Sequence, residues 1–534
     1  MKNIKYILFT LSLLFLATGC NDFLDKKPES DLLLDDFWKK ESDVDAVVRA
    51  CYCAMQEDDF MSRVILWGEL RGDNVIANTS ADDDIKQINN VNILPTNGYC
   101  SWKSFYTVIN YCNTVLKYAP DVVHIDPNFS EKDLQAREAE VYAIRALCYF
   151  YLVRTYRDIP YSTEATVSNA QNLLIKQTPP DEVLDNITND LLQAEQWALK
   201  SYPTVSATKG RITQDAIRAI LADVYLWRQN YGKCIEYCDK LINETETQIS
   251  YSGAITVRPK YQLVNEMFSS ASSAITLSNS SVSSIIFENG NSSESIFELQ
   301  FSSDNKNDML TNLYGQTAVG KLIATTSYAT TTSVFPETDQ RKSDFIVTKA
   351  TQAGQYQIFK YLGHRISDVS AFPYSFKITT SNWIFYRITD IMLMKAEALV
   401  QLSGSEDNLR KALQIVNTTY KRANHSSASP VDTLDYKNYN TQNAMESLVL
   451  LERQRELMFE GKRWFDLVRM AERKKTTEPL VNGVISKYTS NQNMISIKLS
   501  VMNAIYLPIS QNELVVNTLL KQNPYYETSS DIVK

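Results

Sequence analysis

Residues 452–469 hold the densest group of side chains that could do chemistry. Glu452, Glu456 and Glu460 recur every four residues, which places them along one face of a helix. Two of these carboxylates could form the acid/base pair of a glycosidase, but such a pair must flank a sugar bond across a cleft. Here arginines alternate with the carboxylates, so we predict an ion network that locks helices together, built with Arg453, Arg455 and Arg463.

The other catalytic patterns fail at specific positions. Residues 315–322 match most of a phosphate-binding loop, but Leu322 replaces the Ser or Thr that would hold magnesium. No strand-like apolar run precedes Gly315 either. No glycine pair frames a serine as a nucleophile elbow, and there is no dinucleotide fingerprint. We therefore expect no catalytic residue, no cofactor and no enzyme activity.

The eight cysteines and three histidines are poorly spaced for a metal site. The histidines lie far apart, at positions 124, 364 and 425. Cys51 and Cys53 would point away from each other on a helix, and Cys234 and Cys238 have poor geometry for a bridge. We predict no metal site, and we expect most of these thiols to be buried as small hydrophobic groups.

The first twenty residues indicate export. A short basic start, an apolar run over 7–16 and the sequence Ala-Thr-Gly before Cys20 are typical of a signal peptide over 1–19. Small residues directly before a cysteine also resemble a bacterial lipobox, in which Cys20 becomes the lipidated first residue. The alternative is an ordinary signal peptide with Cys20 near the cut. Removal of residues 1–19 takes the formal charge of the chain from −8 to −10. This negative charge disfavours nucleic acid as a partner and adhesion to anionic lipid, so the lipid on Cys20 is the expected link to the membrane.

The elements that must position these groups are mostly helical. There are only 15 Gly and 15 Pro, and apolar residues step at three and four over 43–55, 102–113 and 131–156. Helical pairs over 214–242 and 390–421 resemble tetratricopeptide repeats, although any helical hairpin would look similar. Between 245 and 381 a Ser/Thr-rich insertion predicts irregular structure, with brief strands or turns at 285–287 and 296–299.

Several ordered motifs resemble the SusD/RagB family of outer-membrane nutrient-binding lipoproteins from the Bacteroidetes. The 452–469 run looks like the family's C-terminal signature, and the segment after Cys20 looks like its mature N-terminus. Further matches lie at 137–160, 387–398 and 507–526, with Arg157 at a position where glycine is usual.

The resemblance implies an all-α fold, in which a tetratricopeptide-like scaffold of helical pairs packs against an irregular, mostly helical ligand-binding half with a few short strands. We divide the chain into a signal peptide (1–19), an N-terminal helical region (20–244), the ligand-side insertion (245–381) and a C-terminal helical region (382–534). The implied function is capture of oligosaccharide at the cell surface for a SusC-like, TonB-dependent outer-membrane transporter, without catalysis. A peptide-importing relative, a helical interaction scaffold and a surface glycoside hydrolase remain as alternatives.

A ligand site is expected in the loop before Trp102 and in the insertion. Sugars bind through flat rings and planar polar groups, and the loop offers several within a short stretch. The predicted glycan-binding residues are Arg71, Asp73, Asn74, Asn97, Tyr99 and Tyr314, with Tyr356 and Trp383 as competitors of Tyr314. Trp102 itself is assigned to the core because its helical stripe continues through Tyr106 and Ile109.

Overall fold

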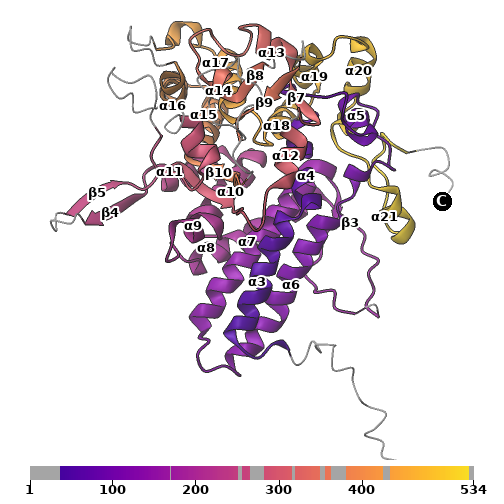
Figure 1. Ribbon diagram of the computed structural model, residues 1–534, viewed down its shortest axis with the longest axis vertical. Coiled ribbons are helices and arrows are strands. Elements are labelled where there is room, and N and C mark those ends of the chain that lie inside the picture. Colours follow the sequence, from indigo (N-terminus) through magenta and orange to yellow (C-terminus); the bar gives the residue numbers. More distant parts are fainter. Residues whose placement is uncertain are drawn as a thin grey trace, which may run out of the picture.

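The computed structural model describes residues 37–168, 170–249, 255–264, 282–315, 319–348, 355–361, 380–424 and 433–527. Long N-terminal helices stand below a cap of C-terminal helices (Figure 1). The predicted all-α class, with helical pairs and a few short strands, is confirmed. Cys20 and the predicted signal peptide lie outside the described residues.

The N-terminal part is a bundle centred on α7, which spans Glu131–Tyr156 as predicted. Ser130 caps this helix by accepting a hydrogen bond from the Asp133 amide. Both apolar stripes of α7 are buried because α6 and α8 pack along it, while α3 packs against α6. The helices of this part are α3 (Glu41–Gln56), α4 (Asp58–Glu69), α5 (Asp83–Asn89), α6 (Lys103–Val123), α7, α8 (Pro180–Trp197) and α9 (Val205–Gly210), with the short turn η2 (Gly98–Cys100).

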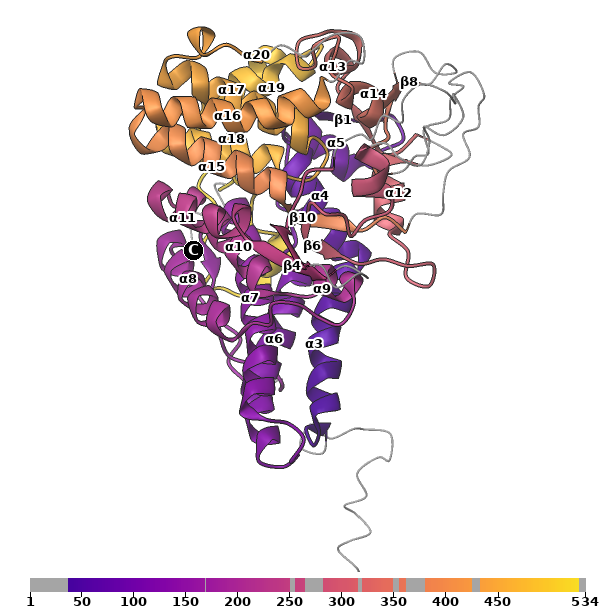
Figure 2. The same ribbon diagram turned by 90° about the vertical axis from the view of Figure 1, so that its left-hand side faces the viewer.

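Two helical pairs connect this bundle to the cap. α10 (Gln214–Trp227) packs on α11 (Tyr231–Ile242), and α15 (Ile388–Ser403) packs on α16 (Glu406–Ala423). α11 also packs on α15, so the pairs form one stack, visible in Figure 2. The chain then continues through η5 (Tyr436–Asn438), α17 (Gln442–Leu457), α18 (Arg463–Lys474), α19 (Glu478–Val484), η6 (Ile485–Lys487), α20 (Gln492–Leu499), η7 (Met502–Ile505) and α21 (Gln511–Val516).

The strands are short, and each pairs with one antiparallel neighbour. The pairs are β1 (Val75–Ala77) with β7 (Leu322–Ala324), β2 (Ile159–Pro160) with β3 (Gln177–Thr178), β4 (Thr245–Ile249) with β5 (Ile255–Pro259), β6 (Ser295–Leu299) with β10 (Trp383–Arg387), and β8 (Ile346–Thr348) with β9 (Tyr356–Ile358). The strand predicted at 296–299 is β6. Residues 285–287, expected as a brief strand or turn, lie in the π-helical turn η4 (Ser284–Glu288) and not in a strand. The short helices in the described parts of the insertion are α12 (Asp308–Tyr314), α13 (Thr326–Thr330) and α14 (Arg341–Phe345).

The core holds the aromatic and thiol side chains that the sequence assigned to it. Trp102 is 3% exposed, which confirms its place in the core. All described cysteines are unpaired, and all are buried except Cys53. Within the described ranges, no helix is long and apolar enough to cross a membrane.

Candidate functional site

Segment 69–75, which carries three of the predicted ligand residues, lies buried between the N-terminal and C-terminal parts of the chain. Arg71 donates hydrogen bonds to the main-chain oxygens of Ala504 and Ile505, at 2.5 and 2.6 Å. Its guanidinium carbon also lies 4.3 Å from the centre of the Trp464 ring, a favourable cation–π geometry. Arg71 therefore ties this segment to two C-terminal elements.

Asp73 is held by three partners from distant segments. Its carboxylate accepts two hydrogen bonds from Arg463 at 2.6 and 2.9 Å, one from the Tyr328 hydroxyl at 2.7 Å and one from Gln454 at 3.0 Å. Burial alone would raise the pKa of Asp73, but the Arg463 charge and these hydrogen bonds outweigh it and lower the pKa. Asp73 is thus a charged partner inside the protein.

Asn74 and Glu69 complete the same junction. Asn74 donates to the Glu69 carboxylate at 2.7 Å, and Glu69 also accepts from the amides of Phe459 and Gly461 at 3.0 and 3.1 Å. Burial raises the pKa of Glu69 to about 7, because its hydrogen bonds and the charge of Lys360 offset only part of the desolvation.

The ammonium of Lys487 binds the main chain of the same segment. It donates to the main-chain oxygens of Leu70 and Gly72, each at 2.7 Å. Burial lowers the pKa of Lys487 to about 7. We call segment 69–75 with these partners the buried junction. Arg71, Asp73 and Asn74 are at most 5% exposed there, so their side chains bind protein groups and present no face to a ligand.

The other predicted ligand residues are divided between the interior and the surface. Asn97 is buried and caps η2 by accepting from the Tyr99 amide. Tyr314 is fully buried, with its hydroxyl donating to the Phe459 oxygen at 2.9 Å, and Trp383 is fully buried as well. Tyr99 and Tyr356 are half-buried. The structure therefore leaves Tyr99 and Tyr356, rather than Tyr314 or Trp383, as the predicted rings with an exposed part.

The run at 452–469 forms an ion network, as predicted, but the cations that pair with Glu456 and Glu460 come from other segments. Glu456 accepts from Arg387 at 2.7 Å and from Arg341 at 3.0 Å, and it also pairs with Arg422. These cations outweigh the desolvation that would raise the pKa of Glu456, and they hold it well below its usual range. Glu460 accepts from Arg387 and from Lys360 at 2.6 Å.

A second part of the network joins α15, α17 and α18. Arg453 donates to both oxygens of Asp466, at 2.9 and 3.0 Å, and to Asp390 at 3.0 Å. Burial would raise the pKa of Asp466, but Arg453 and Arg469 lower it to about 2. All of these groups are buried and paired. The network therefore fixes helices and does not present an acid/base pair to a cleft.

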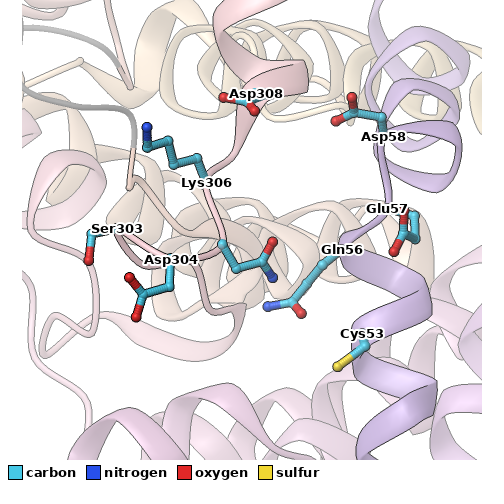
Figure 3. A pocket seen from close by; sticks show the side chains of 9 residues that line it. Cys53, Gln56, Glu57, Asp58, Ser303, Asp304, Lys306 and Asp308 are labelled. Carbon is cyan, nitrogen blue, oxygen red and sulfur yellow. The ribbon is translucent and has the colours of Figure 1, made fainter.

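An open polar pocket lies elsewhere, between the α3–α4 junction and the loop before α12 (Figure 3). Its volume is about 400 Å³, and its walls come from two stretches of chain. Its lining residues are Cys53, Gln56, Glu57, Asp58, Ser303, Asp304, Asn305, Lys306 and Asp308. All are exposed except Gln56. We call this the acidic pocket.

The acidic pocket carries four carboxylates and one lysine, a formal charge of −3. Partial burial raises the pKa of Asp58, and the charges of Asp308 and Glu57 add to this effect. The loop is held in shape locally, because the Ser302 amide donates to the Asn305 oxygen at 2.9 Å. Sequence reasoning missed these residues, although their Ser/Asp/Asn composition at 302–308 marks an exposed loop.

Two family models together cover nearly all of the chain after the predicted signal peptide. A model described as "SusD family" matches residues 225–526, and one described as "Starch-binding associating with outer membrane" matches residues 22–226. The first spans more than half of the chain. The protein belongs to the SusD family.

Individual relatives agree with this assignment over their full lengths. The chain is 24% identical to SusD-like protein P38 of Formosa agariphila, across 98% of this chain and 99% of that protein. It is 26% identical to SusD-like protein P2 of the same organism, across 98% and 100%. A SusD superfamily crystal structure from Bacteroides vulgatus superposes with a TM-score of 0.69 at 19% identity, covering 92% of this chain and all of that one.

Proposed function

We propose that this protein is a surface lipoprotein of the outer membrane that captures oligosaccharide and passes it to a SusC-like, TonB-dependent transporter. The family assignment supports carbohydrate capture at the outer membrane, since one matching model is described by starch binding and outer-membrane association. Cys20 would carry the lipid anchor. The protein makes and breaks no bond in this role.

The acidic pocket is the observation that carries the proposal. Carboxylate and amide groups at Asp304, Asn305 and Gln56 can accept and donate the paired hydrogen bonds that sugar hydroxyls require. A cavity of about 400 Å³ lies in the range of small-ligand sites. Its charge of −3 disfavours anionic sugars, so the expected ligand is a neutral oligosaccharide.

The residues predicted from the loop act in two ways in this proposal. Arg71, Asp73, Asn74 and Asn97 hold the loop and its neighbours in place from inside the protein. Tyr99 does not line the acidic pocket, so its half-buried ring, whose hydroxyl donates to Asp82 at 3.2 Å, would make a separate contact with a longer oligosaccharide. Tyr314 acts as a core residue.

Titration calorimetry against neutral plant, host and microbial oligosaccharides tests the ligand class. We expect Asp304→Asn and Asn305→Ala to weaken binding several-fold. The first replaces an acceptor oxygen by an NH2 donor and the second deletes the amide, and each lost hydrogen bond is worth about 1 kcal/mol. Asp407→Asn is the matched control, since Asp407 is exposed on α16 and does not line the pocket. Equal affinity in all three variants would place the ligand elsewhere. Binding of short peptides and of no glycan would favour the peptide-importing alternative.

Cys53 offers a direct test of the location. It is exposed, lines the acidic pocket, and is the one described cysteine that is not buried. A bound oligosaccharide should slow maleimide labelling of Cys53, and labelled protein should lose affinity. Unchanged labelling at saturating ligand would rule out this pocket. Release of reducing sugar during the same incubation would support the hydrolase alternative.

Membrane attachment is tested with Cys20→Ala. We expect a folded protein that no longer sediments with the outer membrane. Wild-type protein should remain there after a high-salt wash and co-purify with the transporter from detergent. Retention of Cys20→Ala in washed membranes would contradict the lipid anchor.

A further inference from the structure

A second pocket lies at the C-terminal end of α7, formed by different segments from the acidic pocket. Its volume is about 420 Å³. The end of α7, the strand β3 and residues 503–527 converge around it, on the side of the molecule where β3 and α21 are labelled in Figure 1. Because Arg157 stands at the turn that forms part of its wall, we call it the Arg157 pocket.

The backbone at Arg157 has a conformation that L-residues rarely adopt. Its φ is +71° and its ψ is −77°, and the Asp158 amide donates to the Tyr156 oxygen at 3.0 Å. This combination is a classic γ-turn, a strained form. Glycine would adopt it without steric cost. Strained residues of this kind gather at functional sites, so the arginine here needs an explanation.

Neighbouring segments hold the strained turn in place. Gln177 donates to the Asp158 oxygen at 3.1 Å, and Ile159 pairs with Thr178 in the β2–β3 ladder. The Leu507 amide donates to the Thr155 oxygen at 2.9 Å on the other side. The turn is therefore a fixed part of the pocket wall that carries the Arg157 guanidinium at the surface.

Two amide side chains that line the pocket form hydrogen bonds within the protein. The Gln522 amide bonds the main chain of Ile509 in both directions, and Asn523 donates to the Asn503 oxygen. These hydrogen bonds fix the segments that form the pocket wall, so the two amides are not free to bind a ligand.

The basic groups at the rim are less engaged. Among the residues that the structure describes, Arg157 pairs only with Asp158, at 3.5 Å, and half of its side chain is exposed. Lys176 and Lys521 are exposed and have no ion-pair partner among the described residues. With Asp158 and Glu527 as the acids, the pocket carries a formal charge of +1 on a chain whose formal charge is −8.

We propose that the Arg157 pocket binds an anionic sugar residue, one that carries a carboxylate or a sulfate ester. The three basic groups would pair with the anion, and the guanidinium fork matches either group. The apolar wall of Ile509, Leu519 and Pro524 would contact the C–H face of the ring. This inference rests on the proposed function, since it assumes a glycan ligand. It extends that function from neutral to acidic glycans.

Arg157→Gly separates binding from folding. Glycine relieves the strained turn, so we expect the Tm to stay the same or rise. The loss of charge-assisted hydrogen bonds should weaken binding of an anionic sugar about tenfold or more. Lys176→Ala combined with Lys521→Ala should weaken it several-fold. Arg410→Ala is the matched control, because its side chain is 53% exposed, close to the 51% of Arg157, and it does not line the pocket.

The ligands are a galacturonate trisaccharide, a sulfated galactose oligosaccharide and neutral cellotriose and maltotriose, all measured by titration calorimetry at two salt concentrations. The first two separate a carboxylate from a sulfate source, and binding of either should weaken with salt. If neither anionic oligosaccharide binds, or if Arg157→Gly binds them as tightly as wild type, this proposal is wrong. Binding of a neutral oligosaccharide at the acidic pocket would still support the proposed function. Absence of all glycan binding would overturn both.

Discussion

The buried junction and the acidic pocket are built from the same residue types, but the side chains of the junction bind other protein groups whereas those of the pocket face solvent. Both are rich in aspartate, glutamate and amide side chains. In the junction, Asp73 and its neighbours are at most 5% exposed and each finds a partner within the protein. In the pocket, Asp304 and Lys306 face solvent. A polar side chain is available to a ligand only where the fold leaves it without a protein partner.

The difference follows from the cost of burying charge. A buried carboxylate must be paired, and removing one partner leaves an uncompensated charge that is strongly destabilising. Exposed charges gain little from each other because water screens them. Substitutions in the junction and its ion network should therefore damage folding, whereas substitutions in the two pockets should damage binding.

The largest expected effect comes from the ion network and the tryptophan beside the junction. Glu460→Ala and Trp464→Ala should each lower the free energy of unfolding by about 3–5 kcal/mol, because the first removes the carboxylate that pairs with Lys360 and one of those that pair with Arg387, and the second empties a core site. Glu406→Ala, which breaks an exposed pair with Arg410, should cost about 0.5 kcal/mol. Denaturant unfolding measures all three. Full stability combined with lost glycan binding in Glu460→Ala would assign that residue to the ligand.

Gly68, which packs closely near the junction, and Gly232, which has open space around it, test the same contrast through packing. A Cβ atom added at Gly68 would lie 1.8 Å from the main-chain oxygen of Gly461, so the helix α4 could not keep its approach to the junction. We expect Gly68→Ala to cost about 3 kcal/mol or more. Gly232, in α11, has open space around its added Cβ, and Gly232→Ala should stabilise by about 0.4–1 kcal/mol. Equal Tm values for the two variants would contradict the close contact.

The pH dependence of stability should reveal Glu69 inside the junction. Its folded-state pKa of about 7 lies above the ordinary value of 4.5. The unfolded chain therefore gives up this proton at lower pH than the folded protein, and the folded protein loses stability as pH rises from about 4.5 to about 7. Glu69→Gln imitates the neutral acid and keeps hydrogen-bonding capacity toward Asn74.

The stability of Glu69→Gln relative to wild type should therefore increase by about 3 kcal/mol between pH 5 and pH 8. Urea unfolding at both pH values measures this difference, and Glu406→Gln serves as an exposed control. A difference that does not change with pH would show that Glu69 is ionised in the folded protein across this range.

The sequence predicted the helices well because their signal is local. The three- and four-residue steps of α7 and the capping residues before it are visible within one segment. The ion network could be predicted only in outline, since Arg341, Arg387 and Arg422 reach Glu456 from far along the chain. Spacing within 452–469 contains no information about them.

The candidate site was predicted less well, for the same physical reason. The polar run from Arg71 to Asn74 resembles an exposed loop by composition, and only the tertiary partners Arg463, Gln454 and Ile505 make it internal. Conversely, the acidic pocket joins the end of α3 to a loop about 250 residues later, a contact that no local pattern encodes. The strained turn at Arg157 was visible as an arginine in a glycine position, although its pocket was not.

The smallest expected effect concerns Tyr99, one of the two predicted rings that are half-buried. Its main-chain oxygen accepts from Trp67 and its main-chain amide donates to Asn97, so the backbone stays anchored when the side chain is changed. Stacking of a sugar on one ring contributes on the order of 1 kcal/mol. Tyr99→Ala should therefore weaken glycan binding several-fold, whereas Tyr99→Phe, which keeps the ring, should retain it. Calorimetric titrations of both variants, with Tm values as the folding control, measure the effect. Equal weakening in both would assign the hydroxyl rather than the ring, and unchanged affinity in both would make Tyr99 part of the support, like Asn97 beside it.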